Sequence, residues 1–268
     1  MPPKRKPAAR KPASRKGTPA ANKGKPAASK GTPAANKGKP AASKGRPAAS
    51  RGKPGAHKGK PGARKAVAHL SSQDPVLAGV IAAVGRLPDA RDGRPAREDH
   101  YGALVRTIVG QQLSVYAARA IYGRLTERFS GRPPTPAEIL AEKPEELRAA
   151  VGLSRAKVSF LRSLAEHVIH GELELERLDE LDDEQVTAEL VAVKGLGTWS
   201  AQMFLMFHLE RPDVLPVGDL GIRRAIERAY ELDALPEAAE IERIGAPWRP
   251  YRTLACRYLW QSLRNRPM

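Results

Sequence analysis

Apolar residues recur at three- and four-residue spacing through almost all of the chain from about Val67 onward. This spacing is typical of amphipathic helices that bury one face. The segments 99–114, 114–129 and 154–169 show it most clearly, and no stretch alternates as a strand would. The pattern predicts an all-α body of about eleven helices, with enough residues for a substantial core.

Helix-start signals support this reading. Asp74 stands directly before Pro75, so the two are expected to be the N-cap and the first residue of a helix. Ser154 is a candidate cap for the helix that follows it. Two short helices near residues 136 and 144 are each expected to open with a proline.

The first 65 residues differ sharply from the rest. They hold 20 of the 46 Lys and Arg residues and no Asp or Glu, so the remaining 26 basic residues face all 29 acidic ones. A 14-residue repeat, KGTPAANKGKPAAS, occurs at 16–29 and again at 30–43. Such a segment cannot bury enough apolar surface to fold, so we expect a disordered tail that binds nucleic acid in a salt-sensitive way. A solubilising linker is the alternative.

The composition also bears on the compartment. No apolar run of membrane-spanning length occurs, and no apolar segment follows the basic N-terminus as in a signal peptide. One cysteine, Cys256, excludes an internal disulfide framework and any multi-cysteine zinc or iron–sulfur site. We expect no membrane partner and a cytoplasmic, nucleoid-associated protein, or a nuclear one in a eukaryote.

A glycine-rich turn separates two of the predicted helices. In VAVKGLGTWSAQ the residues Lys194, Gly195, Leu196 and Gly197 interrupt two apolar runs. A G-x-G turn before a helix can point free N–H groups outward and so hold a phosphate, with Lys194 adding a point charge. An ordinary connection between two helices is the alternative, and the spacing alone does not decide.

Five segments together carry a family resemblance. In chain order they read LVRTIVGQQLSVYAA, GLSRAKVSFLRSLA, LVAVKGLGTWSA, DVLPVGDLGIRRAI and APWRPYRTLACRYLW. Over about residues 74–264 the chain resembles the helix-hairpin-helix DNA glycosylases, most of all the alkylated-base branch, 3-methyladenine DNA glycosylase II. The resemblance implies a two-lobed all-α domain over 66–268 with its hairpin at 186–206, preceded by the tail 1–65. The β-rich N-terminal domain of longer bacterial members has no counterpart.

The resemblance also implies the chemistry. Bifunctional members place a nucleophilic lysine two residues after the second hairpin glycine, where this chain has Trp199. We therefore expect a monofunctional enzyme that uses water to excise 3-methyladenine and 7-methylguanine, initiating base excision repair. Asp219, after the proline-containing loop, matches the catalytic aspartate, although an Asp there can also simply cap a helix. Asp213 is interpreted as a surface turn residue. No cofactor or metal is required, although a monovalent cation on hairpin carbonyls fits the family.

The remaining site residues follow from the same resemblance. Trp199 and Tyr101 are candidate stacking faces for a flipped base, while Met203, Leu220 and Arg257 fall where pocket aromatics are expected. Gln112 or Leu113 is the candidate wedge. The alternative is that Gln111 and Gln112 merely make hydrogen bonds at a helix end. Trp248 and Trp260 are interpreted as core. The expected contacts to the DNA backbone are Lys194, Gly195, Leu196, Gly197, Thr198, Ser154 and Lys157, although a solvated helix face also explains the last two.

The expected partner is double-stranded DNA that contains damaged bases, bound by a monomer. A non-catalytic DNA-binding or nucleoid protein is the second hypothesis, because hairpins and lysine-rich tails also occur in pure binders. A glycosylase for another damaged base is the third. A pure binder needs neither Asp219 nor Trp199, so these two residues discriminate between the hypotheses.

Overall fold

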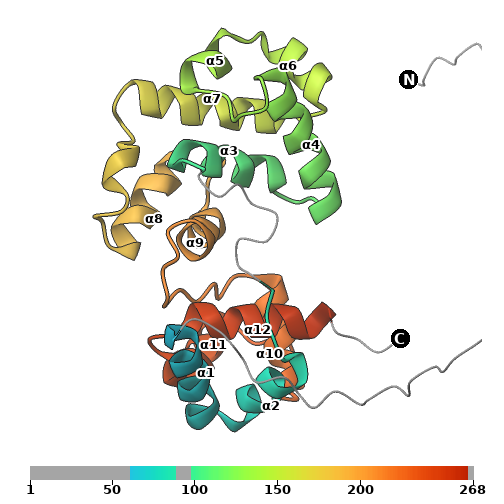
Figure 1. Ribbon diagram of the computed structural model, residues 1–268, viewed down its shortest axis with the longest axis vertical. Helices are drawn as coiled ribbons and strands as arrows, with labels where there is room; N and C mark the ends of the chain where they lie inside the picture. The colour runs from blue at the N-terminus through green and yellow to red at the C-terminus, as the bar shows by residue number, and fades with distance from the viewer. Residues whose placement is uncertain (1–60, 89–97, 265–268) are drawn as a thin grey trace, which may run out of the picture. The chain divides into compact units, whose positions relative to one another are not determined.

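The computed structural model describes residues 61–88 and 98–264, which fall within one compact unit. These residues form twelve α-helices and two short 3-10 helices, with no strand among them (Figure 1). The predicted all-α body is therefore confirmed. The predicted tail lies outside the described residues except for 61–65, which belong to the first helix, so the boundary expected after residue 65 falls inside that helix.

The helices group into two lobes (Figure 1). The first lobe is the middle of the chain: α3 (His100–Gly110), α4 (Val115–Arg128), α5 (Pro136–Ala141), α6 (Pro144–Val151), α7 (Arg155–Ile169), η1 (Leu175–Arg177), α8 (Asp183–Ala192) and α9 (Thr198–Phe207). The second lobe joins both ends of the described chain: α1 (Pro61–Gln73), α2 (Pro75–Val84), α10 (Leu220–Ala229), α11 (Ala238–Gly245), η2 (Ala246–Trp248) and α12 (Arg252–Arg264).

The helix starts follow the predicted signals. Pro136 and Pro144 open α5 and α6, and the hydroxyl of Ser154 accepts a hydrogen bond from the Lys157 amide at the start of α7. Proline suits the first turn of a helix because its ring fixes φ near the helical value. It also has no amide hydrogen, which in this turn would have no partner within the helix. None of the described helices has the length and apolar character needed to span a membrane.

The buried Asp74 links the start of α2 to residues near the C-terminal end of the described chain. Asp74 is the N-cap of α2, as predicted, and its Oδ1 accepts a hydrogen bond from the Leu77 amide at 2.9 Å. The other oxygen accepts from the hydroxyl of Tyr230 and, at 2.8 Å, from Nε1 of Trp248. Because Trp248 is fully buried, this confirms its interpretation as a core residue and gives its N–H the partner that burial demands.

Candidate active site

The loop that leads to Asp219 is fastened to α12. Oδ1 and Oδ2 of Asp213 accept hydrogen bonds from Arg252 and Arg249, each at 2.8 Å. The hydroxyl of Thr253 accepts from the Val214 amide at 3.0 Å and donates to the Arg211 carbonyl at 2.7 Å. Asp213 lies in a turn, as predicted, but it is partly buried and anchors the loop through two arginine partners.

Asp219 ends this loop as the N-cap of α10, and three N–H groups converge on its carboxylate. The Ile222 amide donates to Oδ1 at 2.8 Å, which is the expected capping bond. Nε1 of Trp199 donates to Oδ2 at 2.8 Å. Since Trp199 belongs to α9 of the first lobe and Asp219 caps α10 of the second, the carboxylate lies where the two lobes meet, beside the start of the hairpin helix.

The third donor was missed by the sequence analysis. Nε1 of Trp260, on α12, donates to Oδ1 of Asp219 at 2.8 Å, so Trp260 is part of the site and not merely core. Its ring stacks on Phe207 at a centroid distance of 5.8 Å. A Cβ on Gly221 would lie 2.9 Å from both Asp219 Oδ1 and Trp260 Nε1. The glycine two residues after the aspartate was the one local sign of this close approach.

The glycine-rich turn has the geometry expected of a hairpin. Gly195 has φ +91°, and a Cβ there would lie 2.1 Å from the ring of Phe160, so only glycine fits. Leu196 is 4% exposed, which restricts it to contacts through its backbone. Gly197 and Thr198 are exposed at the start of α9, where no side chain of the described residues forms a cap. The first N–H groups of α9 thus have no side-chain cap among the described residues, and the open space beside Gly197 leaves this helix end accessible to a phosphate.

The loop between α3 and α4 is locked to this hairpin. The side-chain amide of Gln111 donates to the Gly195 carbonyl at 2.7 Å and to the hydroxyl of Ser200 at 3.1 Å. Gln112, at the tip, is exposed and has φ +56°, a conformation that L-residues seldom adopt. Gln111 therefore makes the structural bonds, while Gln112 and the 37%-exposed Leu113 are free to meet a ligand.

Lys157 has a different position from the one predicted. Its ammonium donates to the carbonyls of Val109 and Gln111, at 2.7 and 2.8 Å, and burial lowers its pKa. These carbonyls end α3, where a cation is favourable. The contact to a DNA phosphate predicted for Lys157 is therefore revised, because its charge holds the α3–α4 loop. Ser154 is exposed but serves as the cap of α7.

The predicted base-pocket residues do not all come together. Trp199 and Leu220 are 42% and 48% exposed beside Asp219, and Met203, one turn along α9, is partly buried. Tyr101 is 5% exposed in the core formed with Leu104 and other residues of α3, so its ring faces are covered. Tyr101 lies on the apolar face of α3. The spacing of apolar residues along this helix therefore predicts its burial, whereas its aromatic ring alone suggested a place in the pocket.

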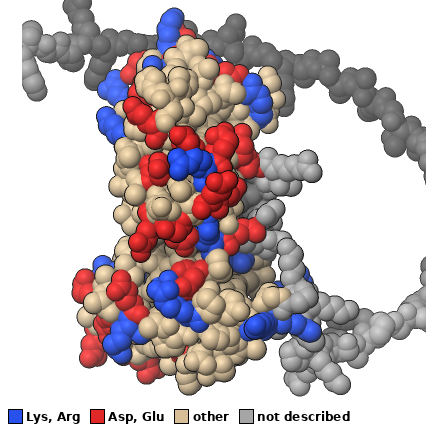
Figure 2. Space-filling model, turned by 90° about the vertical axis from the view of Figure 1, so that its left-hand side faces the viewer, with Lys and Arg blue, Asp and Glu red and all other residues tan. Residues whose placement is uncertain are grey.

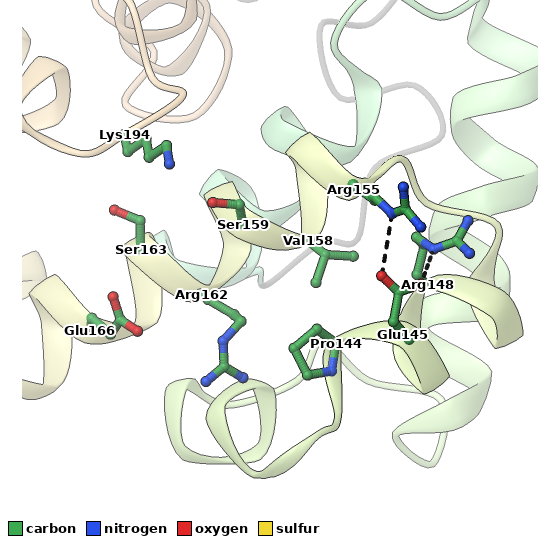
Figure 3. A pocket seen from close by; sticks show the side chains of 10 residues that line it. All are labelled: Pro144, Glu145, Arg148, Arg155, Val158, Ser159, Arg162, Ser163, Glu166 and Lys194. Atoms are coloured by element: carbon green, nitrogen blue, oxygen red, sulfur yellow. Dashed lines mark hydrogen bonds and ion pairs between the residues drawn. The ribbon is translucent and has the colours of Figure 1, made fainter.

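A second feature is a cleft with a volume of about 390 Å³, which lies between α6 and α7 and is lined on the hairpin side by Lys194 (Figure 3). Lys194 faces Ser159 and Ser163 of α7 across it, while Arg155 and Arg148 both pair with Glu145. The cleft does not include Asp219 or Trp199. Lys194 thus extends from the hairpin toward α7 and is exposed.

Comparisons with known proteins agree with this arrangement. Residues 105–250 match the family described as "HhH-GPD superfamily base excision DNA repair protein". DNA-3-methyladenine glycosylase 1 of Schizosaccharomyces pombe is 33% identical over 200 residues, covering 74% of this chain and 86% of that protein.

Two solved structures are similar in fold and in sequence. That of the S. pombe 3-methyladenine DNA glycosylase Mag1 in complex with abasic DNA has a TM-score of 0.64 and 34% identity, covering 73% of this chain and 95% of that one. That of the DNA-3-methyladenine glycosidase of Bacillus halodurans has a TM-score of 0.63 and 35% identity, covering 75% and 89%.

Proposed function

Because the chain belongs to the HhH-GPD superfamily of base excision DNA repair proteins, we propose that it is a monofunctional glycosylase that releases alkylated purines from DNA by hydrolysis. The observation that carries this proposal is the Asp219 carboxylate, held by two indole N–H groups beside the uncapped start of the hairpin helix. A protein that only binds DNA has no use for a carboxylate oriented in this way.

DNA is the partner that this surface fits. The exposed N–H groups at the start of α9 suit a phosphate, and the exposed tip at Gln112 and Leu113 lies beside them. The S. pombe relative is seen with abasic DNA, which is the product of base removal. We propose that the hairpin holds the strand that carries the damaged base and that the tip fills the gap left when this base is flipped out.

The carboxylate has one open acceptor position. A carboxylate accepts about four hydrogen bonds, two on each oxygen. Within residues 61–88 and 98–264, Oδ1 accepts from Trp260 and Ile222, whereas Oδ2 accepts from Trp199 alone. The remaining position on Oδ2 can orient or deprotonate a water molecule, and the negative charge stabilises the oxocarbenium-like sugar that forms as the base leaves.

Alkylated purines suit this site because alkylation at N3 or N7 makes the base cationic and a good leaving group. Little help from a general acid is then needed. Trp199, at the position of the lysine in bifunctional enzymes, cannot act as an amine nucleophile, and its N–H is bonded to Asp219. Burial raises the pKa of the Cys256 thiol well above its usual range, which removes it as a nucleophile.

The exposed face of Trp199 is our candidate for stacking on the cationic base. Leu220 forms part of the same exposed surface. We also propose that the protein acts as a monomer. A monovalent cation bound to hairpin carbonyls would support the phosphate grip without taking part in the chemistry.

Our first prediction concerns Asp219→Asn. The amide is isosteric but neutral, and its N–H₂ would face an indole N–H. We expect the single-turnover release of 7-methylguanine and 3-methyladenine from methylated duplex DNA to fall at least about 100-fold, with DNA binding largely kept. Released bases are measured by chromatography, and Asp233→Asn, at an exposed loop position, is the matched control.

A borohydride trap run in parallel tests for a covalent intermediate. Methylpurine release without a trapped adduct would support water as the nucleophile, and an adduct would contradict it. If the wild-type protein binds DNA but releases no methylpurine, the alkylpurine proposal is wrong, and a panel of other damaged bases is the next test. Equal loss of binding and release in Asp219→Asn would argue against a catalytic role.

A further inference from the structure

Exposed large apolar side chains gather around the proposed DNA-binding elements. In the described part of the chain, Leu113, Val115 and Tyr116 are 37%, 52% and 85% exposed, all within four residues of one another. Trp199 and Leu220 are also exposed, and both belong to the site. The other exposed large apolar residues, Val76, Ile169 and Val191, stand singly on three different helices. A cluster of this kind is the usual mark of an interaction surface.

We propose that Val115 and Tyr116, which follow the tip at Leu113, form an apolar platform that packs against the strand opposite the damaged base, with Tyr116 as its main contact. This inference rests on the proposed function. Tyr116 lies on the first turn of α4, two residues beyond the cap at Ser114. Since it is 85% exposed, its ring contributes little to the core and is available for a base or a sugar.

The position of the loop favours DNA as the occupant. Gln111 fastens the start of the loop to the hairpin carbonyl of Gly195, and Lys157 fixes the same end to α7. If the hairpin holds the damaged strand and Gln112 enters the base stack, the residues that continue into α4 lie on the far side of the tip. Because the base stack joins both strands, a tip that enters it from the damaged strand brings the residues on its far side to the second strand.

The charges around the platform agree with this occupant. Residues 100–126 contain Arg106, Arg119 and Arg124 but no Asp or Glu. Arg119 is exposed and lies three residues after Tyr116, so both share one face of α4. A phosphate beside a base that packs on Tyr116 is therefore within the reach of Arg119. Arg106 is paired with Glu98, so Arg119 is the charge that faces a partner beside Tyr116. A second copy of this chain would place another Arg119 at the same face, and this like charge disfavours a dimer there.

The test uses a duplex with a tetrahydrofuran abasic analogue opposite 2-aminopurine. Fluorescence anisotropy gives the affinity over a salt series, and 2-aminopurine emission reports packing on the opposite base. For Tyr116→Ala we expect about 10-fold weaker binding with an unchanged salt slope and a smaller change in emission on binding. Tyr116→Phe should behave as wild type, and Arg119→Gln should lower the slope by about one.

The contact to the opposite strand is tested by removing that strand. On the single strand with the abasic analogue, Tyr116→Ala should bind as tightly as wild type. Ile169→Ala, at a 50%-exposed position on α7, is the control for loss of exposed apolar area. Unchanged duplex affinity and emission in Tyr116→Ala, or an equal loss on the single strand, would overturn the proposal. A concentration-dependent dimer that Tyr116→Ala dissolves would identify a second copy as the occupant instead.

The probe contains no alkylated base to release, because the abasic analogue takes its place. The result is therefore independent of whether the wild-type protein excises methylpurines, and failure of this inference can be told from failure of the proposed function.

Discussion

At the residue scale, the site depends on how one carboxylate is held. Asp219 receives indole N–H groups from α9 and from α12, 20 and 41 residues away in sequence. Hydrogen bonds to an ionised group are among the stronger ones in proteins and fix its direction. Gly221 makes room for the second of these bonds, since any larger residue would separate Asp219 from Trp260.

Trp260→Phe tests the second indole. Phenylalanine keeps an aromatic ring against Phe207 but cannot donate to Oδ1 of Asp219. We expect the single-turnover excision rate to fall about 10-fold, while the affinity for abasic duplex stays near wild type. Trp248→Phe is a matched control, because it removes the N–H bonded to the buried Asp74 and should lower Tm with little change in rate. An unchanged excision rate in Trp260→Phe, with a lower Tm, would exclude a role for Trp260 in positioning Asp219.

At the element scale, three segments that are distant in sequence act as one unit. Gln111 joins the α3–α4 loop to the hairpin, and Lys157 joins it to α7. These bonds hold the tip at Gln112 in its left-handed conformation, which costs free energy and persists only where surrounding contacts determine it. The proposed phosphate grip and the proposed wedge are thus joined by direct hydrogen bonds.

Lys157→Met distinguishes the two roles considered for this lysine. Methionine keeps most of the apolar stem but leaves the carbonyls of Val109 and Gln111 without the ammonium. We expect weaker binding to abasic duplex and slower excision, with the salt slope unchanged because no phosphate contact is lost. A slope reduced by about one would restore the phosphate contact predicted from the sequence. Lys143→Met, at a 79%-exposed lysine, is the control.

The sequence predicted the elements better than the side-chain contacts. Spacing and caps indicated the helices, including the caps Asp74 and Ser154, because these are local signals. The motif order indicated Asp219 and Trp199, which the structure brings within hydrogen-bond distance. Trp260 was missed and Tyr101 was misplaced, because which face of a helix meets a site depends on contacts between helices that are far apart in sequence. Apart from Gly221, no local pattern in the sequence indicates which face of each helix that is.

At the scale of the whole molecule, charge is segregated. Residues 172–189 carry nine Asp and Glu residues and one Arg, and Figure 2, viewed from the side of α8, shows acidic side chains gathered across the middle of that face. Residues 100–126 carry no acidic residue at all. Phosphates are therefore repelled from the α8 side and favoured on the side of the α3–α4 loop.

Deletion of residues 1–60 tests the basic tail while leaving α1 whole. The deleted segment carries 18 of the 46 basic residues and no acidic ones. We expect weaker binding to undamaged DNA and a smaller salt slope, because fewer counterions are released, with the single-turnover rate at saturating enzyme unchanged. Anisotropy over a salt series measures the slope, and an unchanged slope would contradict this view of the tail.

Stability should depend on pH through His208. Burial and the neighbouring His100 lower the pKa of His208 to about 4, from an ordinary value near 6.5. The unfolded chain therefore binds a proton below about pH 6.5 that the folded chain takes up only near pH 4. The contribution of His208 to the free energy of unfolding is therefore fully present above pH 6.5 and is lost as the pH falls toward 4.

Urea titrations at pH 7 and pH 5 measure this effect. We expect the free energy of unfolding to fall between the two values, and to fall less in His208→Gln, which cannot titrate. The difference between the two proteins isolates His208 from the carboxylates, which titrate in both. An equal fall in both proteins would show that His208 does not contribute.

The second lobe contains the first and the last helices of the described chain, and this has a consequence for biosynthesis. On a ribosome, the helices α3–α9 emerge together and can pack with the hairpin in place. The lobe with α1 and α2 must wait for α10–α12, which bring Asp219 and Trp260. A nascent chain thus contains the hairpin that we propose as the grip on DNA before it contains Asp219, the carboxylate that we propose as catalytic. A chain that stops after α9 is therefore expected to lack base excision, whatever affinity for DNA it keeps.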